Sequence, residues 1–174
     1  MKLLSIDGAT VTSGYAIFDK DNKTLLKYDK VNIDDKDLSM RDRVVRMIDE
    51  FGKIIDTYNP DEIIMEEVPP AINNSSTVLA LGILSGGILG LAHSKGIEIK
   101  YIPVPTWHSV LGIKKSKGEI KEQSINWVNE YYGLDLKYYS KSSKKNQDNE
   151  SDAIAIGSVW IGNYDKSSTG FGRR

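Results

Sequence analysis

The 174-residue chain contains no cysteine, which excludes disulfides, thiolate nucleophiles and cysteine-bound zinc. Histidine is almost as scarce, with only His93 and His108, so a metal site built on imidazole is not expected. We recognise no signal peptide ahead of the first predicted strand, and charges interrupt the apolar runs before they reach a membrane-spanning length. The chemistry left to this sequence is that of oxygen ligands, which its 24 Asp and Glu residues supply.

The composition, with 40% hydrophobic and 27% charged residues, predicts one globular domain with a core of its own. A net charge of -1 does not by itself favour a nucleic-acid partner. Lysines are nevertheless concentrated in two segments, 114–121 and 137–145, which contain four each, against Glu119 as the one acid. Such segments are either solvated loops or a phosphate-binding surface.

The N-terminal segment predicts a β-hairpin. The apolar run Leu3–Ile6 leads into Asp7, a glycine-containing turn follows, and a second apolar run extends from Gly14 to Phe18. Asp is a poor residue for a central strand, so we expect Asp7 to bind a metal ion at the end of the strand. A third strand over 24–33 follows the turn-forming residues 21–23.

A second acidic strand end follows one helix later. Ser39 and Asp42 resemble a capping box, and apolar residues on one face predict a helix over 39–57. Residues 62–68 then form a short apolar strand that ends on Glu66 and Glu67, before Pro69-Pro70 stops it. Successive strand residues point to opposite faces, so regular geometry does not bring both acids to one site.

The segment 75–94 is an apolar helix in which Gly82, Gly86 and Gly90 recur along one line. Glycine is unfavourable inside a helix, so the stripe indicates a close backbone approach, to the sheet in the simpler interpretation or to a partner subunit in the other. The helix is expected to be too short and too broken by glycine to span a membrane.

The remaining elements are a strand over 97–102, a helical turn over 106–111, a basic loop over 112–118 and a helix over 119–132. Residues 137–149 predict a mobile loop, the last helix covers 150–161 with Asp152 near its start, and the tail 165–174 is expected to be disordered. Trp107 and His108 are interpreted as packing residues.

Carboxylates thus fall at the ends of two strands and at the start of the last helix. Neighbouring parallel strands lie about 4.8 Å apart, so acids at their ends come close together. Mg²⁺ prefers oxygen ligands, and two such ions can activate a water molecule and stabilise a leaving oxygen. The layout fits metal-dependent phosphoryl transfer on a polyanion.

From about Leu4 to Ile161 the chain resembles the ribonuclease H-like superfamily, and within it the RuvC-type Holliday junction resolvases, especially phage-encoded relatives. The segments that carry the resemblance are Ile6-Asp7 through Gly14-Tyr15, Ile64-Met65-Glu66-Glu67-Val68, Asn74 to Gly82, Pro105-Thr106-Trp107, Gly112-Ile113, Lys121-Glu122-Gln123 and Ser151-Asp152-Ala153-Ile154-Ala155. Each segment is weakly specific, whereas their common order is fairly specific.

The resemblance implies an α/β ribonuclease H-like domain over 1–164, with a five-stranded mixed sheet of three antiparallel and then two parallel strands, flanked by helices. It implies catalysis with Mg²⁺, or Mn²⁺ as a substitute, in a homodimer that acts on branched DNA in the cytoplasm of a bacterial or phage-infected cell. The implied metal ligands are Asp7, Glu66, Asp152 and Asn149, with Lys121 as a further catalytic or phosphate-contacting residue. The implied DNA contacts are Lys114, Lys115, Lys117 and Lys121.

Three positions depart from the family. Gly8-Ala9 stands where the family usually has Pro-Gly, and Pro69-Pro70 stands where relatives place an aromatic wedge. Asn149 replaces an Asp or His, which leaves Asp148 or Glu150 as alternative ligands. For the second acidic strand the alignment favours Glu66 as the ligand, with Glu67 as its neighbour.

The leading hypothesis is a structure-selective endonuclease that cleaves Holliday junctions by metal-activated water attack on the phosphodiester and leaves 5′-phosphate ends. Alternatives are a ribonuclease H-like nuclease acting on RNA–DNA hybrids or flaps, and a non-cleaving junction-binding protein. A sugar-kinase or actin-like ATPase shares the first strand pattern but requires a second homologous domain, for which the chain is too short.

Overall fold

The computed structural model describes residues 1–68 and 75–164, so the predicted stop at Pro69-Pro70 and the predicted tail lie outside the described residues. Its centre is a five-stranded sheet in the order β3-β2-β1-β4-β5. The strands are β1 (Lys2–Asp7), β2 (Thr12–Asp19), β3 (Thr24–Asn32), β4 (Glu62–Glu66) and β5 (Glu98–Ile102). The first three strands pair antiparallel, and β1, β4 and β5 pair parallel, which confirms the predicted fold class.

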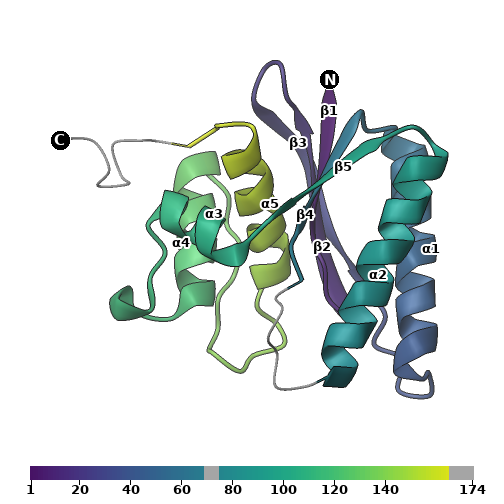
Figure 1. The fold of residues 1–174 in the computed structure, drawn as a ribbon. Coiled ribbons are helices and arrows are strands. Elements are labelled where there is room, and N and C mark those ends of the chain that lie inside the picture. The colour runs from purple at the N-terminus through teal and green to yellow at the C-terminus, as the bar shows by residue number, and fades with distance from the viewer. Residues whose placement is uncertain (69–74, 165–174) are drawn as a thin grey trace.

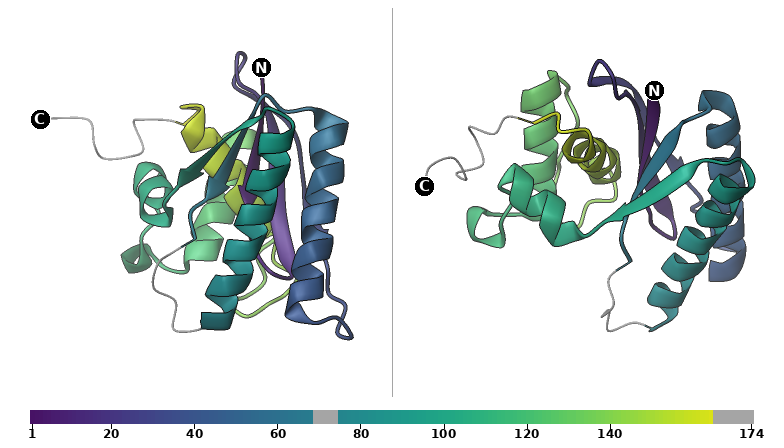
Figure 2. Two further views of the ribbon diagram at one scale, coloured as in Figure 1. Left: turned by 45° about the vertical axis from the view of Figure 1, so that its right-hand side comes forward. Right: turned by 45° about the horizontal axis from the view of Figure 1, so that its top comes forward.

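Helices cover both faces of this sheet (Figures 1 and 2). They are α1 (Met40–Tyr58), α2 (Ser75–Ser94), α3 (Val104–Leu111), the short 3-10 helix η1 (Lys115–Lys117), α4 (Ile120–Tyr132) and α5 (Asp148–Trp160). As the sequence predicts, Ser39 caps α1, because its Oγ accepts a hydrogen bond of 3.1 Å from the backbone N of Asp42. Helices α1 and α2 lie on one face, and α5 lies on the other with α3 and α4 beyond it (Figure 1).

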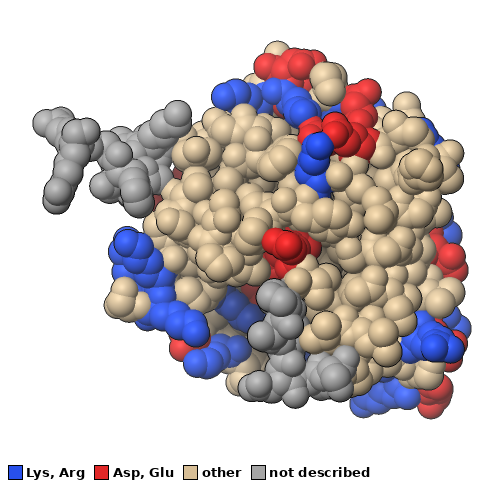
Figure 3. All heavy atoms as spheres, in the orientation of Figure 1, with Lys and Arg blue, Asp and Glu red and all other residues tan. Residues whose placement is uncertain are grey.

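Helix α2 presents a largely apolar surface to solvent. It contains no Lys, Arg, Asp or Glu, and much of the surface around it is uncharged in Figure 3. Leu79 is 64% exposed and Leu89 is 44% exposed. Among the described residues, no atom outside the backbone of α2 itself lies within 4 Å of a Cβ placed on Gly82, Gly86 or Gly90. The simpler interpretation of the glycine stripe, close packing on the sheet, is therefore wrong.

Another expectation about α2 also needs correction. Residues Ser76–Ser94 are long and apolar enough, by length and composition, to cross a membrane, although 22% of this span is buried within the fold. A stripe with helical spacing packs into the core between α1 and the sheet: Ala80, Leu84, Ile88 and Ala92. This stripe makes α2 an integral part of the α/β domain.

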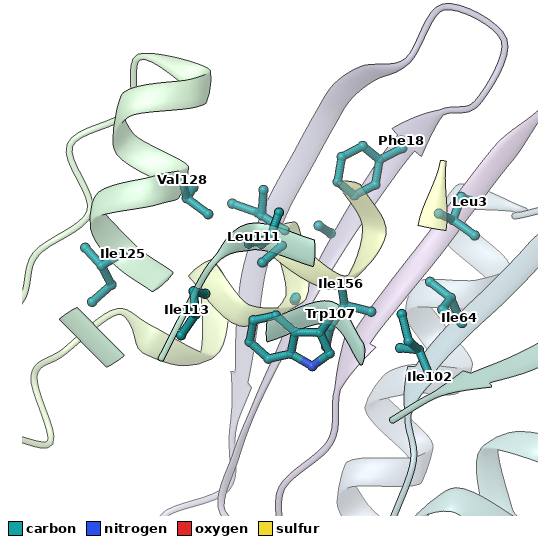
Figure 4. Close-up of a cluster of buried hydrophobic side chains, with 14 of the residues drawn as sticks. Leu3, Phe18, Ile64, Ile102, Trp107, Leu111, Ile113, Ile125, Val128 and Ile156 are labelled. Carbon is teal, nitrogen blue, oxygen red and sulfur yellow. The ribbon is translucent and has the colours of Figure 1, made fainter. Parts of the chain in front are cut away.

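The alternation of side chains along β1 and β4 divides the core into two clusters. One lies beneath α1 and α2 and includes Leu4, Ile6, Ile63 and Met65. The other lies beneath α5 and is drawn in Figure 4, where it includes Leu3, Phe18, Ile64 and Trp107. Because strand side chains alternate, the residues two positions beyond Ser5 and Ile64 lie on the α5 face. These residues are Asp7 and Glu66.

Candidate active site

The first two carboxylates lie at adjacent strand ends. Strands β1 and β4 run parallel with Ile6 opposite Met65, and Asp7 and Glu66 are the next residues of each strand. Glu67 lies beyond the end of β4 with an exposed side chain, while its backbone N donates to the carbonyl of Ile102. The alternation thus separates the two neighbouring acids, and Glu66 is the one on the α5 face.

Helix α5 brings the third carboxylate, Asp152, to the same sheet edge. The helix lies unusually close to the sheet because glycine stands at two contact points. A Cβ on Gly14, which pairs with Asp7 across the β1–β2 ladder, would lie 1.8 Å from the backbone oxygen of Asn149. A Cβ on Gly157 would lie 2.2 Å from the Phe18 ring. No side chain fits in either place, so Gly14 allows the start of α5 to approach β2, and Gly157 allows the same for the C-terminal part of the helix.

The three carboxylates line one cavity of about 680 Å³, which we call the carboxylate cavity. Residues of α3, of the η1 segment, of α4 and of the loop before α5 complete its wall. They include Trp107, His108, Lys115, Glu119, Lys121 and Lys141. Figure 3 shows acidic side chains beside a hollow near the centre of the face in view. Residues far apart in the sequence thus share one concave, charged surface.

Burial acts on all three acids, and repulsion from neighbouring carboxylates acts on Asp7 and Asp152. Burial raises the pKa of Asp7 well above its usual value, and the charges of Asp152, Glu66 and Asp148 raise it further. Burial also raises the pKa of Asp152, to about 7, although a hydrogen bond from Ser124 opposes the shift. The pKa of Glu66 is raised by burial and lowered in part by a hydrogen bond from Trp107. An added cation would relieve this repulsion.

Lys121 is a cation whose charge acts on both Asp7 and Asp152. Its ammonium group forms an ion pair with Asp148, whose carboxylate is almost completely buried. Burial lowers the pKa of Lys121, but the hydrogen bond and charge of Asp148 outweigh it, so the net shift is upward. Lys121 is therefore charged and points its positive end toward the carboxylates.

The structure distributes the remaining predicted site residues over different surfaces. Asn149 lines a neighbouring cavity and not the carboxylate cavity, whereas Asp148 acts electrostatically on both Asp7 and Asp152. Glu150 forms an ion pair with Lys30 over 3.1 Å. Of the predicted DNA-contacting lysines, Lys115 and Lys121 line the carboxylate cavity, while Lys114 and Lys117 are exposed outside it.

Two further residues contact the carboxylates directly. The Trp107 indole Nε1 donates a 3.2 Å hydrogen bond to Oε2 of Glu66, and Ser124 Oγ donates a 2.5 Å hydrogen bond to Oδ1 of Asp152. The sequence favoured a packing role for Trp107 and gave no signal for Ser124. A buried Trp requires a partner for its N–H, which is the signal that could have identified Trp107.

The carboxylate cavity has the donor chemistry that a hard divalent cation requires. Its acids offer only oxygen ligands, and their mutual repulsion favours an ion of opposite charge. Within residues 1–68 and 75–164, no group of three or more Asp, Glu, His or Cys side chains is already close enough to hold an ion. The residues fit a cation in type and number, and their side chains must close on it.

Comparison with known families identifies relatives of the whole domain. The family model described as "Crossover junction endodeoxyribonuclease RuvC" matches residues 3–160. A protein of that name from Fusobacterium nucleatum is 28% identical over 159 residues, which cover 90% of this chain and 77% of the relative. The protein of that name from Borrelia turicatae is 27% identical and covers 94% of this chain and 97% of its own.

Solved structures show the same fold at low sequence identity. A structure described as Thermus thermophilus RuvC in complex with a Holliday junction substrate superposes with a TM-score of 0.67 at 16% identity. It covers 94% of this chain and 97% of that one. The fowlpox virus resolvase, solved with Holliday junction DNA, gives a TM-score of 0.59 at 18% identity and covers 93% and 97% of the two chains.

Proposed function

The chain belongs to the RuvC family of crossover junction endodeoxyribonucleases, and from that premise we propose that it cleaves four-way DNA junctions and other branched DNA. One observation supports this most directly. Asp7, Glu66 and Asp152, from three separate elements, line a single cavity together with Lys121. Such a set of acids beside a cation suits the hydrolysis of a phosphodiester.

We propose Mg²⁺ as the cofactor, with Mn²⁺ as a substitute. Asp7, Glu66 and Asp152 would hold it. As the fourth ligand we favour Asp148 over Asn149, because Asp148 is acidic and its charge acts on Asp7. When bound, the cation would lower the pKa of a water molecule and stabilise the leaving 3′ oxygen, so that hydrolysis breaks the bond between phosphorus and this oxygen and leaves 5′-phosphate and 3′-hydroxyl ends.

The protein side chains supply orientation and charge. The ammonium group of Lys121 stabilises the negative charge that develops on the phosphate, and its pairing with Asp148 fixes its position. Hydrogen bonds from Trp107 and Ser124 hold Glu66 and Asp152 in one orientation each. Preorganisation of this kind reduces the rearrangement needed in the transition state.

We further propose that the protein acts as a homodimer through α2. The exposed stripe of Gly82, Gly86 and Gly90 has no neighbour among the described residues, and two exposed leucines flank it. A stripe of small residues lets the backbone of a second helix approach closely, and the same stripe on a second copy is self-complementary across a two-fold axis. Two active sites related by a two-fold axis match the near two-fold symmetry of a four-way junction.

The direct test is to incubate the protein with labelled four-way junction, flap, RNA–DNA hybrid and plain duplex, with Mg²⁺ or EDTA, beside Asp7→Asn. Symmetric nicks in the junction that require Mg²⁺ and Asp7 are expected. Cleavage that persists in EDTA or in Asp7→Asn would refute the metal mechanism. Hybrid or flap cleavage without junction cleavage would favour the alternative nuclease, and tight junction binding that never yields nicks would indicate a non-cleaving protein.

Thermal unfolding tests metal binding without relying on activity. A ligand that binds the folded state stabilises it by about 2.7 kcal/mol at one hundred times its Kd. Addition of Mg²⁺ should therefore raise the Tm of the wild type and leave the Tm of Asp7→Asn almost unchanged. An equal shift in both proteins would show that the cation binds elsewhere.

A further inference from the structure

A second cavity of about 490 Å³ adjoins the carboxylate cavity. We call it the loop cavity, because residues 141–144 of the loop before α5 form one wall, and residues 9–12 after β1 form another. Lys121 and Lys141 line both cavities. A linear polymer whose reacting group lies at the carboxylates can therefore continue past these two lysines into the loop cavity.

The loop that forms this cavity is structured at its base. Asn146 is 2% exposed, its Oδ1 accepts from the backbone N of Tyr139 over 2.8 Å, and its Nδ2 donates to the carbonyl of Ser140 over 2.7 Å. Lys137 and Gln147 close the loop with two further hydrogen bonds of 3.0 Å. These hydrogen bonds hold the two ends of the predicted loop together. Lysines on a preorganised loop lose less entropy when they bind a ligand.

The lining of the loop cavity is positive, with four lysines against two aspartates. Two of the lysines are already committed, because Lys30 pairs with the buried Glu150 and Lys121 pairs with the buried Asp148. Lys141 makes only an exposed ion pair with Glu119 over 3.2 Å, which is weak and easily exchanged. Among the described residues Lys144 forms no ion pair. Two cations are thus available to an incoming anion.

The other lining groups define the kind of anion. Hydroxyl and amide groups of the lining, such as those of Thr12, Ser142 and Asn32, can donate to phosphate oxygens. No aromatic side chain of the described residues lines the loop cavity, so it offers no platform on which an unpaired base could stack. Its chemistry suits the sugar–phosphate backbone.

We propose that the loop cavity binds the backbone of the DNA strand that continues from the scissile phosphate, with Lys141 and Lys144 each contacting one phosphate. This inference rests on the proposed function, because it takes the carboxylate cavity as the place of the scissile phosphate. Within the lysine segment 137–145, whose alternative interpretation is a solvated loop, it assigns a nucleic-acid contact to Lys141 and Lys144. It also gives a role to the hydrogen bonds that close this loop.

The test compares two double variants that each remove two lysines from the same loop. Lys141→Ala/Lys144→Ala removes the two that line the cavity. The control, Lys137→Ala/Lys145→Ala, removes two that do not line it; Lys137 pairs with Asp135 over 2.5 Å, and Lys145 is exposed. Binding of labelled four-way junction is measured in EDTA, where the metal-dependent reaction is blocked, between about 50 and 200 mM salt.

Each lost phosphate contact lowers the slope of log K against log salt concentration by about 0.9. The cavity variant should therefore show a slope about 1.8 shallower than the wild type. Over the fourfold rise in salt, its loss of affinity should then be about twelve times smaller than the loss in the wild type. The control should keep the wild-type slope. In phosphate ethylation interference, the wild type should show sensitive phosphates on one side of the nick that disappear in the cavity variant.

Equal slopes in the two double variants, or unchanged interference in the cavity variant, would overturn the inference. Failure of the proposed function is distinguishable, since it appears in the wild type as absence of junction nicking in Mg²⁺, with or without junction binding. A wild type that binds and nicks junctions, beside a cavity variant with an unchanged slope, would refute only the phosphate contacts assigned to Lys141 and Lys144.

Discussion

The indole Nε1 of Trp107 donates a hydrogen bond to Oε2 of Glu66 over 3.2 Å, although the two residues belong to different elements. Trp107 is 1% exposed, and the edge of its ring contacts His108 with ring centroids 4.0 Å apart. Glu66 ends β4 and has no strand residue beyond it to hold its side chain. Helix α3 therefore sets the orientation of this carboxylate.

Trp107→Phe should weaken the response to metal while preserving the core. The phenyl ring keeps most of the buried apolar contact but lacks the indole N–H that donates to Glu66. Loss of a group that orients a metal ligand typically costs 10–100-fold in metal affinity or activity. The measurement is the Mg²⁺ concentration at half-maximal junction nicking, with Trp127→Phe as the control because Trp127 stacks on Tyr131. Equal Mg²⁺ dependence in both variants would contradict the assigned role.

Ser124→Ala tests the hydrogen bond to Asp152. Ser124 is fully buried, and its Oγ lies 2.5 Å from Oδ1 of Asp152 and 3.1 Å from Oγ of Ser151. We expect the affinity for Mg²⁺ to fall by about one order of magnitude. The measurement is the rise in Tm as a function of Mg²⁺ concentration. The control is Ser158→Ala, which removes an equally buried hydroxyl of α5 that bonds to Tyr132. An effect of the same size in the control would indicate a general loss of packing.

Asp152→Asn should stabilise the metal-free protein at neutral and higher pH. The folded-state pKa of Asp152 is raised from 3.8 to about 7, so the folded protein retains a proton that the unfolded chain has lost. Stability in EDTA therefore falls as the pH rises from about 4 through 7, by at most roughly 4 kcal/mol for this group. Asn keeps an oxygen for the Ser124 hydrogen bond and carries no charge.

The measurement for this variant is urea unfolding in EDTA at pH 5 and pH 8. The difference in the free energy of unfolding between Asp152→Asn and the wild type should be larger at pH 8. Parallel changes in the two proteins would show that ionisation of Asp152 does not limit stability.

Gly86→Lys should dissociate the proposed dimer. Gly86 lies in the middle of the exposed stripe on α2, where a long charged side chain would separate two helices and place a charge between them. Sedimentation velocity should find the wild type as a dimer and the variant as a monomer at the same concentration. Asn126→Lys adds the same charge to an exposed position of α4 and should remain a dimer. A dimeric Gly86→Lys would place the interface elsewhere.

The sequence predicted the sheet and the strand-end acids because both depend on local patterns. Alternation and turn residues define β1, β2 and β4, and the acids come directly after the apolar runs. The choice between Glu66 and Glu67 depends on which face of β4 lies beneath α5, which no local pattern reveals. Once Ile64 is known to lie in the core beneath α5, alternation places Glu66 on the same face.

Other features of the site were not predictable because they depend on contacts between distant segments. Helix α5 begins at Asp148, two residues before the predicted start, which places Asp148 and Asp152 one turn apart on the same side of the helix. The glycine stripe on α2 was recognised, but only the packing of Ala80 and Leu84 shows that it faces outward. The roles of Trp107 and Ser124 required the coordinates of Glu66 and Asp152.

The close packing of α5 against Gly14 also affects when the enzyme becomes active during its synthesis. Asp7 and Glu66 are contributed by the first half of the chain, whereas Asp152 arrives with the last described helix. During synthesis the ribosome releases the two strand-end carboxylates long before the third exists, and α5 must then pack onto β2. On the proposed function, the growing chain has no nuclease activity until α5 has been synthesised and has packed onto β2, which protects the DNA of the cell from a partly synthesised enzyme.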